Sequence, residues 1–312
     1  MRVCAWVVAI GRRMLLKLEE EGRHPQSAVL RSARGGAPVS KGRRPMGKES
    51  EFELTLTRFS GRKAHVEVPE AADAIGERAF AYNGVLQTIS IPEGIKRVGA
   101  EAFVGCSNLR EVELPESVEE LGKGAFRGCL RLERVRIRGA LKAVSAEAFL
   151  RCKSLREVEL PDGVEEIGEA AFMRCRALAD LTLPPSVRTL GERAFYECES
   201  LSALAFPRGL ETIEDEAFQG CASLRVAHIP EQVGWLGRRC FADCTALEEA
   251  SVPEGVESLE EEAFAGCESL RRVDLPVSLT LIEDRAFFDC PRLEDVQASD
   301  AVKLGQDVFA LS

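Results

Sequence analysis

A phenylalanine recurs at every twenty-third position through most of the 312-residue chain, without an insertion or deletion over ten occurrences. These ten are Phe80, Phe103, Phe126, Phe149, Phe172, Phe195, Phe218, Phe241, Phe264 and Phe287. Ala precedes nine of them, and Cys240 keeps the slot small before the tenth. The following Phe309 comes one position early. A fixed period of this length is typical of a solenoid, in which each repeat forms one coil and adjacent coils bury a shared core.

Three further slots keep the same period. Cys follows nine of the ten Phe residues at the third position, at Cys106, Cys129, Cys152, Cys175, Cys198, Cys221, Cys244, Cys267 and Cys290. Leu follows each Cys at the third position, at Leu109, Leu132, Leu155, Leu178, Leu201, Leu224, Leu247, Leu270 and Leu293. A Pro slot holds Pro69, Pro92, Pro115, Pro161, Pro184, Pro207, Pro230, Pro253 and Pro276. These slots define one unit of sequence that is repeated along the chain.

The residues between the Leu slot and the Pro slot predict a strand. In the segment 109–115, for example, apolar and polar side chains alternate, which is the pattern of a strand with one buried face. Pro115 ends the strand because proline lacks the N–H donor. We therefore expect a β-rich solenoid of about ten coils in a right-handed stack, roughly 50 Å long, with a parallel β-sheet on one face.

The repeat unit Leu-x-x-Val-x-Leu-Pro-x-x-Val-x-x-Ile-Gly-x-x-Ala-Phe-x-x-Cys resembles the BspA-like subclass of leucine-rich repeats, over about residues 66–311. The resemblance implies the solenoid fold, and similar proteins are often displayed at cell surfaces or bind host components. The chain lacks the asparagine ladder of the commonest leucine-rich repeats, so short corner residues are expected to replace it. The corresponding slot holds Gly94, Ser117, Gly163, Ser186, Gly209 and Gly255.

The two ends of the chain depart from the period. Residues 1–50 are expected to form a basic, disordered head, and Met46 is a plausible true start. Residues 51–312 are expected to form the solenoid, with a capping hairpin at about 51–68 because two alternating segments flank Ser60-Gly61. The apolar run Val3–Ile10 is far shorter than the roughly 20 residues of a transmembrane helix, and no good cleavage site follows it. We therefore favour a cytoplasmic location, with secretion or the cell surface as the alternative.

The charge is uneven along the chain. The formal net charge is −10, yet the segment 1–48 carries 11 Lys and Arg against 3 Glu, so the remainder stands at −18. An acidic body repels phosphate backbones, which disfavours nucleic-acid binding by the folded part.

The cysteines and histidines do not form a recognisable reactive site. Zinc ligands come in close pairs, whereas these cysteines recur once per coil, so a metal site is not expected. Equivalent cysteines of stacked coils would lie about 4.8 Å apart with parallel Cβ vectors, so serial disulfides are not expected either. The cysteines are better interpreted as small apolar side chains that are packed in the core. Cys240 takes the place of the Ala that precedes Phe in the other repeats. His24, His65 and His228 lie in no catalytic motif. We predict no cofactor and no enzymatic activity.

The variable strand positions predict the functional surface, because side chains flanking the buried central residue of each strand face outward. One group is charged and alternates in sign between coils: Glu111, Glu113, Arg134, Arg136, Glu157 and Glu159. Such residues form either cross-strand pairs or a recognition stripe. A second, less charged group is Ala203, Ala205, Val226 and His228. Variable aromatic residues, such as Trp235, Tyr196 and Phe288, either anchor an interface or fill gaps between coils.

These features favour a non-enzymatic scaffold that binds a protein, or a glycan, on the strand face. The alternative is an extracellular or cell-surface adhesin that binds host components. The ligand and the oligomeric state are not predicted.

Overall fold

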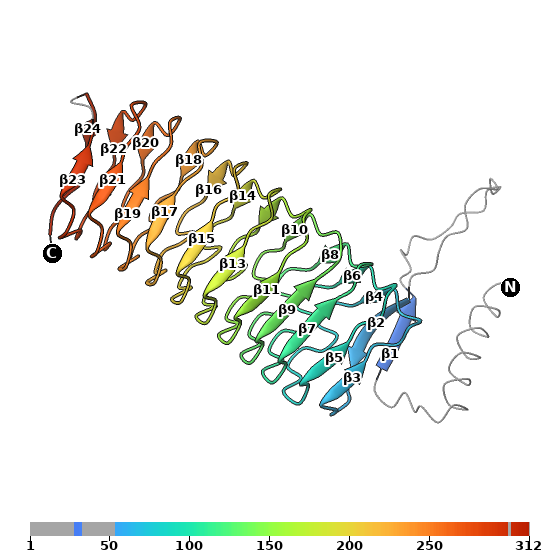
Figure 1. Cartoon of the computed structure of the whole chain (residues 1–312). Helices are drawn as coiled ribbons and strands as arrows, with labels where there is room; N and C mark the ends of the chain where they lie inside the picture. The colour runs from blue at the N-terminus through green and yellow to red at the C-terminus, as the bar shows by residue number, and fades with distance from the viewer. Residues whose placement is uncertain (1–27, 33–53, 299–300, 312) are drawn as a thin grey trace, which may run out of the picture.

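The computed structural model describes residues 28–32, 54–298 and 301–311, and these form strands and turns with no helix. Figure 1 shows the coils stacked side by side along one axis, each contributing one longer and one shorter strand. Every strand pair between coils is parallel and joins residues 22 or 23 positions apart, or 19 positions apart for β2 with β4. The predicted parallel solenoid is confirmed, with about eleven turns.

The longer strands form the predicted sheet, which we call the front ladder. Its members are β3 (His65–Glu67), β5 (Thr88–Ser90), β7 (Glu111–Leu114), β9 (Arg134–Ile137), β11 (Glu157–Glu159), β13 (Asp180–Thr182), β15 (Ala203–Ala205), β17 (Val226–His228), β19 (Glu249–Ser251), β21 (Arg272–Asp274) and β23 (Asp295–Gln297). Hydrogen bonding divides the front ladder into three sheets, β3 to β11, β13 with β15, and β17 to β23.

The two-residue strands, together with the six-residue β2, form a second ladder that the sequence analysis does not predict. Its members are β2 (Leu54–Phe59), β4 (Ala74–Ile75), β6 (Arg97–Val98), β8 (Glu120–Leu121), β10 (Ala143–Val144), β12 (Glu166–Ile167), β14 (Thr189–Leu190), β16 (Thr212–Ile213), β18 (Trp235–Leu236), β20 (Ser258–Leu259), β22 (Leu281–Ile282) and β24 (Lys303–Leu304). Most of these strands contain two residues, which is too short for an alternating pattern to be recognised.

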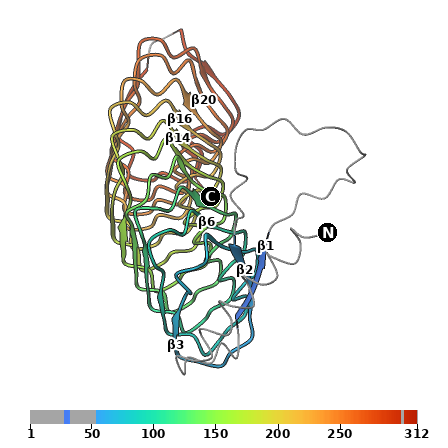
Figure 2. The same ribbon diagram turned by 90° about the vertical axis from the view of Figure 1, so that its right-hand side faces the viewer.

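The core between the ladders is organised by the phenylalanines. Each ring stacks on the ring of the next coil with centroids 5.0–5.7 Å apart, from Phe59 through the ten periodic positions to Phe309. The ten periodic rings are at most 1% exposed. Burial of each ring stabilises the fold by about 1.5–3 kcal/mol, and stacking adds to that. Figure 2, which looks obliquely along the stack, shows successive coils as similar outlines offset from one another.

In the coils where the second position after the proline is serine, its hydroxyl holds the corner, as expected for short residues. Ser117 donates its hydroxyl to the carbonyl of Ile95 at 2.9 Å and accepts the N–H of Gly94 at 3.0 Å. Ser186 likewise donates to the carbonyl of Val164 at 2.6 Å. These hydroxyls link adjacent coils.

The predicted capping hairpin at 51–68 is wrong. β2 and β3 belong to different ladders, because β2 pairs with β4 whereas β3 pairs with β5. The segment is the return half of a coil, and it places Phe59 on the phenylalanine stack. The outer edge of β2 is paired with the antiparallel strand β1 (Ala28–Ser32), which lies within the head expected to be disordered. Residues 1–27 and 33–53, including Met46, lie outside the described residues, so the rest of that prediction stays open.

Candidate functional site on the front ladder

All ten predicted site residues lie on the outer surface of the front ladder. In each of these strands the central side chain is mostly buried, whereas its two neighbours are exposed or half-buried. The alternation that predicts the strand therefore also predicts the orientation of these side chains correctly.

The charged group on this surface is engaged in ion pairs between coils. Arg134 donates from Nε to Glu157 at 2.5 Å and lies 3.5 Å from Glu111, while Arg136 donates to Glu159 at 2.8 Å. The hydrogen bond from Arg134 lowers the pKa of the Glu157 carboxyl below its ordinary value. The cross-strand pairs expected from the alternating signs are therefore present, and a ligand would have to compete with them.

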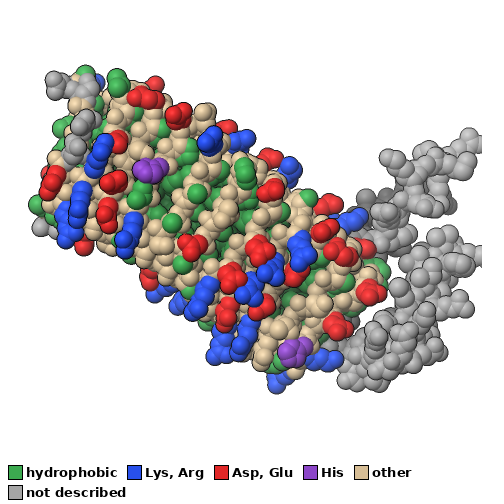
Figure 3. Space-filling model, in the orientation of Figure 1, with side chains coloured by type: hydrophobic (Ala, Val, Ile, Leu, Met, Phe, Trp, Pro, Cys, Tyr) green, Lys and Arg blue, Asp and Glu red, His purple; other side chains and the backbone are tan. Residues whose placement is uncertain are grey.

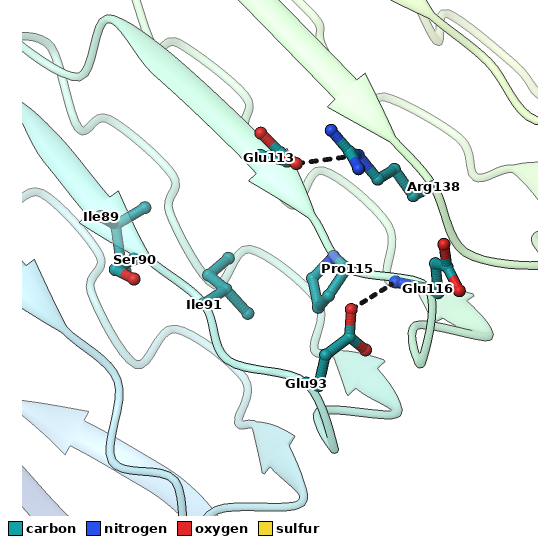
Figure 4. A pocket seen from close by; sticks show the side chains of 8 residues that line it. All are labelled: Ile89, Ser90, Ile91, Glu93, Glu113, Pro115, Glu116 and Arg138. Atoms are coloured by element: carbon teal, nitrogen blue, oxygen red, sulfur yellow. Dashed lines mark hydrogen bonds and ion pairs between the residues drawn. The ribbon is translucent and has the colours of Figure 1, made fainter.

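The remaining member, Glu113, borders a depression at the ends of β5 and β7. It pairs at 2.8 Å with Arg138, which occupies the slot that holds Pro in other coils. Figure 4 shows Glu113 and Arg138 on one side of this depression and Ile89 and Ile91 on the other. On its lower rim, Glu93 accepts the backbone N–H of Glu116 at 3.3 Å. The polar groups that line the depression are thus largely occupied.

The less charged group, Ala203, Ala205, Val226 and His228, forms what we call the neutral patch. In Figure 3 the Lys, Arg, Asp and Glu side chains thin out over β13 to β17, where hydrophobic and uncharged atoms dominate the surface. The patch crosses the break in hydrogen bonding between β15 and β17. At this break Phe206 fills a slot that holds smaller residues in other coils, and its ring meets Phe218 edge-on at 5.6 Å.

The two described histidines make interstrand contacts with hydroxyls. His228 Nδ1 lies 3.4 Å from Ser251 Oγ, and His65 Nδ1 lies 2.6 Å from Thr88 Oγ1. Within the described ranges no group of three or more His, Cys, Asp or Glu residues has the arrangement of a metal site. His65 and His228 therefore take part in hydrogen bonds between neighbouring strands and not in a metal site.

The cysteine ladder lies inside the core. All ten cysteines in the described part are free and buried. In nine coils the thiol donates to the carbonyl of the Phe that lies 26 positions earlier, as Cys152 does to Phe126 at 3.2 Å. Burial raises the pKa of Cys152 to about 12, so this thiol stays protonated. The structure confirms that the cysteines are buried in the core. It also shows that their thiols donate hydrogen bonds between coils, which the sequence analysis does not predict.

The variable aromatic residues lie away from the front ladder. Trp235 is 43% exposed on β18 in the second ladder. Tyr196 lines a hollow beside Met173 in the turns around the phenylalanines, and Phe288 lies under the guanidinium of Arg285 at 5.2 Å. Tyr196 and Phe288 therefore pack at least partly against their own chain, while Trp235 presents its ring to solvent.

The geometry defines a class of protein, the leucine-rich-repeat solenoid with one regular core and one variable strand surface. The chain belongs to the family described as the BspA type leucine rich repeat region, whose profile matches residues 73–202 and 188–312 in six copies. No curated protein sequence matches the chain.

Solved structures share the fold. A leucine-rich cell surface protein from Faecalibacterium prausnitzii has 24% sequence identity and a TM-score of 0.51, with 88% of this chain and 96% of that chain covered. A leucine-rich repeat protein from Bacteroides ovatus has 20% identity and a TM-score of 0.58, with 91% and 90% covered. Another from Eubacterium ventriosum has 25% identity and a TM-score of 0.51, with 54% and 48% covered.

Proposed function

We propose that the chain is a non-enzymatic scaffold that binds a partner protein on the front ladder, with the neutral patch as the centre of the contact. The observation that carries this proposal is the change in surface chemistry at β15 and β17. Ion pairs cover the outer surface over β7 to β11, and exposed small or apolar side chains replace them at Ala203, Ala205 and Val226.

A surface of this kind suits the core of a protein interface. Charged residues are depleted at the centres of interfaces because their desolvation is costly, and they are tolerated at the rim. Ala203 and Ala205 leave the sheet flat, while Val226 is 39% exposed and offers apolar area. The charged group from Glu111 to Glu159 would form one rim, with exposed pairs that contribute mainly orientation.

The proposal is tested by measuring affinity for a partner isolated by cross-linking from the cells that make the protein. Ala205→Arg places a long charged side chain on the flat patch and should weaken binding at least tenfold. Ala140→Arg is a matched control, because Ala140 is exposed on a corner outside the strands. Equal affinities for the two variants, or a larger loss in Arg134→Glu/Arg136→Glu, would contradict the central role of the neutral patch.

The compartment and the adhesin alternative stay predictions. The described ranges contain no helical segment with the length and hydropathy that a membrane crossing requires. Protease treatment of intact cells separates the alternatives, because a displayed adhesin is cleaved while a cytoplasmic scaffold is protected. Cleavage on intact cells would overturn our preference for the cytoplasm and support the adhesin.

A further inference from the structure

Five cationic side chains line the edge where the turns around the phenylalanines lead into the front ladder. We call them the basic edge: Arg110, Arg131, Arg151, Lys153 and Arg156. All five are exposed. Figure 3 shows Lys and Arg side chains along this lower edge, near the starts of β9 and β11. Such a gathering of cations is unexpected on a body whose charge is strongly negative.

The members of the basic edge lack the ion pairs that many other cations of the described ranges make. Among the described residues, none of the five has a carboxylate oxygen within 4.0 Å of its cationic group. Cations that form ion pairs elsewhere in the chain do have one within that distance. Equivalent slots in the next coils are occupied differently, because Arg174 and Arg176 each donate to Glu197 at 3.0 Å. The cations at these two positions of the repeat are therefore paired in one coil, at Arg174 and Arg176, and unpaired in the coil before it, at Arg151 and Lys153.

Two members of the basic edge also lie beside like charges. Equivalent positions of successive repeats are neighbours in adjacent coils, so Arg151 lies next to Arg174 and Lys153 next to Arg176. The backbone bond from the N–H of Arg151 to the carbonyl of Met173, 2.8 Å long, confirms this alignment. Like charges on neighbouring coils repel each other. These cations therefore do not serve the stability of the fold, which favours a role toward a ligand.

The surroundings of the basic edge indicate what kind of ligand fits. Leu130 is 44% exposed next to Arg131 and offers an apolar contact. Glu133 lies between the rungs of Arg110 and Arg156, as backbone bonds of 2.7 and 2.9 Å show. A carboxylate in this position, together with the net charge of −10, repels a continuous polyanion such as a nucleic acid. A short segment with a few carboxylates and an apolar side chain avoids most of that repulsion.

We propose that the basic edge is a second docking surface, which binds an acidic segment of a partner protein through Arg151 and Lys153 and receives an apolar side chain of that segment on Leu130. This surface is distinct from the neutral patch, since it lies on the turns and edge and not on the outward strand positions. A partner that spans both surfaces would be held at two sites and oriented along the stack.

The test uses a fluorescent peptide of six glutamates around one leucine, titrated with the full chain at low ionic strength. Arg151→Glu/Lys153→Glu should weaken binding at least tenfold. The matched control is Arg208→Glu/Arg292→Glu, which makes the same charge change at two exposed cations on other coils and should leave the affinity within about twofold. Ala205→Arg should also leave it unchanged, which separates this proposal from that for the neutral patch.

Several results would overturn the proposal. They are absence of peptide binding, equal losses in the two charge-reversal variants, or tighter binding of duplex DNA or a sulfated polysaccharide through the same residues. Self-association in sedimentation that disappears in Arg151→Glu/Lys153→Glu would also overturn it, because the occupant would then be a second copy. If charge reversal lowers the melting temperature, Arg151→Gln/Lys153→Gln provides the comparison and should weaken binding by a smaller factor.

Discussion

At the scale of single residues, the turn around each phenylalanine requires backbone conformations that most side chains avoid. The residue two positions after Phe has a positive φ in several coils, such as 63° at Arg151 and 58° at Tyr82, whereas Gly105 and Gly128 occupy the same slot elsewhere. A left-handed residue with a Cβ costs about 1–2 kcal/mol. Unpaired Arg151 therefore stores strain that a glycine would relieve.

We predict that Arg151→Gly is more stable than Arg156→Gly by about 1 kcal/mol, because only Arg151 has a positive φ. Urea unfolding of the two variants measures this difference. Equal stabilities, or a less stable Arg151→Gly, would show that the backbone of this turn is not left-handed.

The buried thiols predict a dependence of stability on alkaline pH. Burial raises the pKa of Cys106, Cys152 and Cys198 from 9.0 to about 12. Between these values the unfolded chain loses the thiol proton and the folded chain keeps it, so the free energy of unfolding falls as pH rises above 9. Each thiol contributes up to about 1.4 kcal/mol per pH unit.

Urea unfolding from pH 7 to 10.5 should therefore show a steep loss of stability above pH 9. The variant Cys152→Ala/Cys198→Ala should lose less stability over the same range than the unmodified protein. Parallel losses in the two proteins would contradict the burial of these thiols.

At the scale of elements, the close approach of coils in the second ladder depends on glycine. A Cβ added to Gly122 would collide with the backbone nitrogen of Ala100, whereas one added to Gly234 would meet no atom within 4 Å. Neither glycine has a positive φ, so the two differ in space rather than in backbone conformation.

Gly122→Ala should therefore destabilise the fold by about 1–3 kcal/mol through the forced backbone shift, while Gly234→Ala should change stability by less than about 0.5 kcal/mol. Thermal melts of the two variants provide the comparison. A neutral Gly122→Ala would mean that the coils are farther apart than the structure shows.

The elements also show why the sequence predicts some features and not others. The strand around Val112 was predictable because alternation and a closing proline coincide there. The pairing of β2 was not, because the interval from Phe59 to Phe80 is two positions shorter than the repeat and so falls outside the period. The basic edge was missed because Arg151 and Lys153 become neighbours of Arg174 and Arg176 only when the chain is coiled.

At the scale of the whole molecule, the coils share one core, so damage in one coil should reach its neighbours. Leu178 is fully buried. Leu178→Ala should cost about 2–5 kcal/mol through the lost contacts and the cavity. Hydrogen exchange should accelerate in the coils on both sides of Leu178 as well as in its own. Acceleration confined to residues around Leu178 would argue against a continuous core.

The repeat places its reactive residues inside the core, so that function is left to the surface. Counting reactive thiols tests this claim most directly. Of the 11 cysteines, only Cys4 lies outside the ten that are buried and free. A Cys4→Ala variant treated with a thiol reagent should react at no site while folded and at ten sites in denaturant. Rapid reaction of several thiols in the folded protein would contradict the claim.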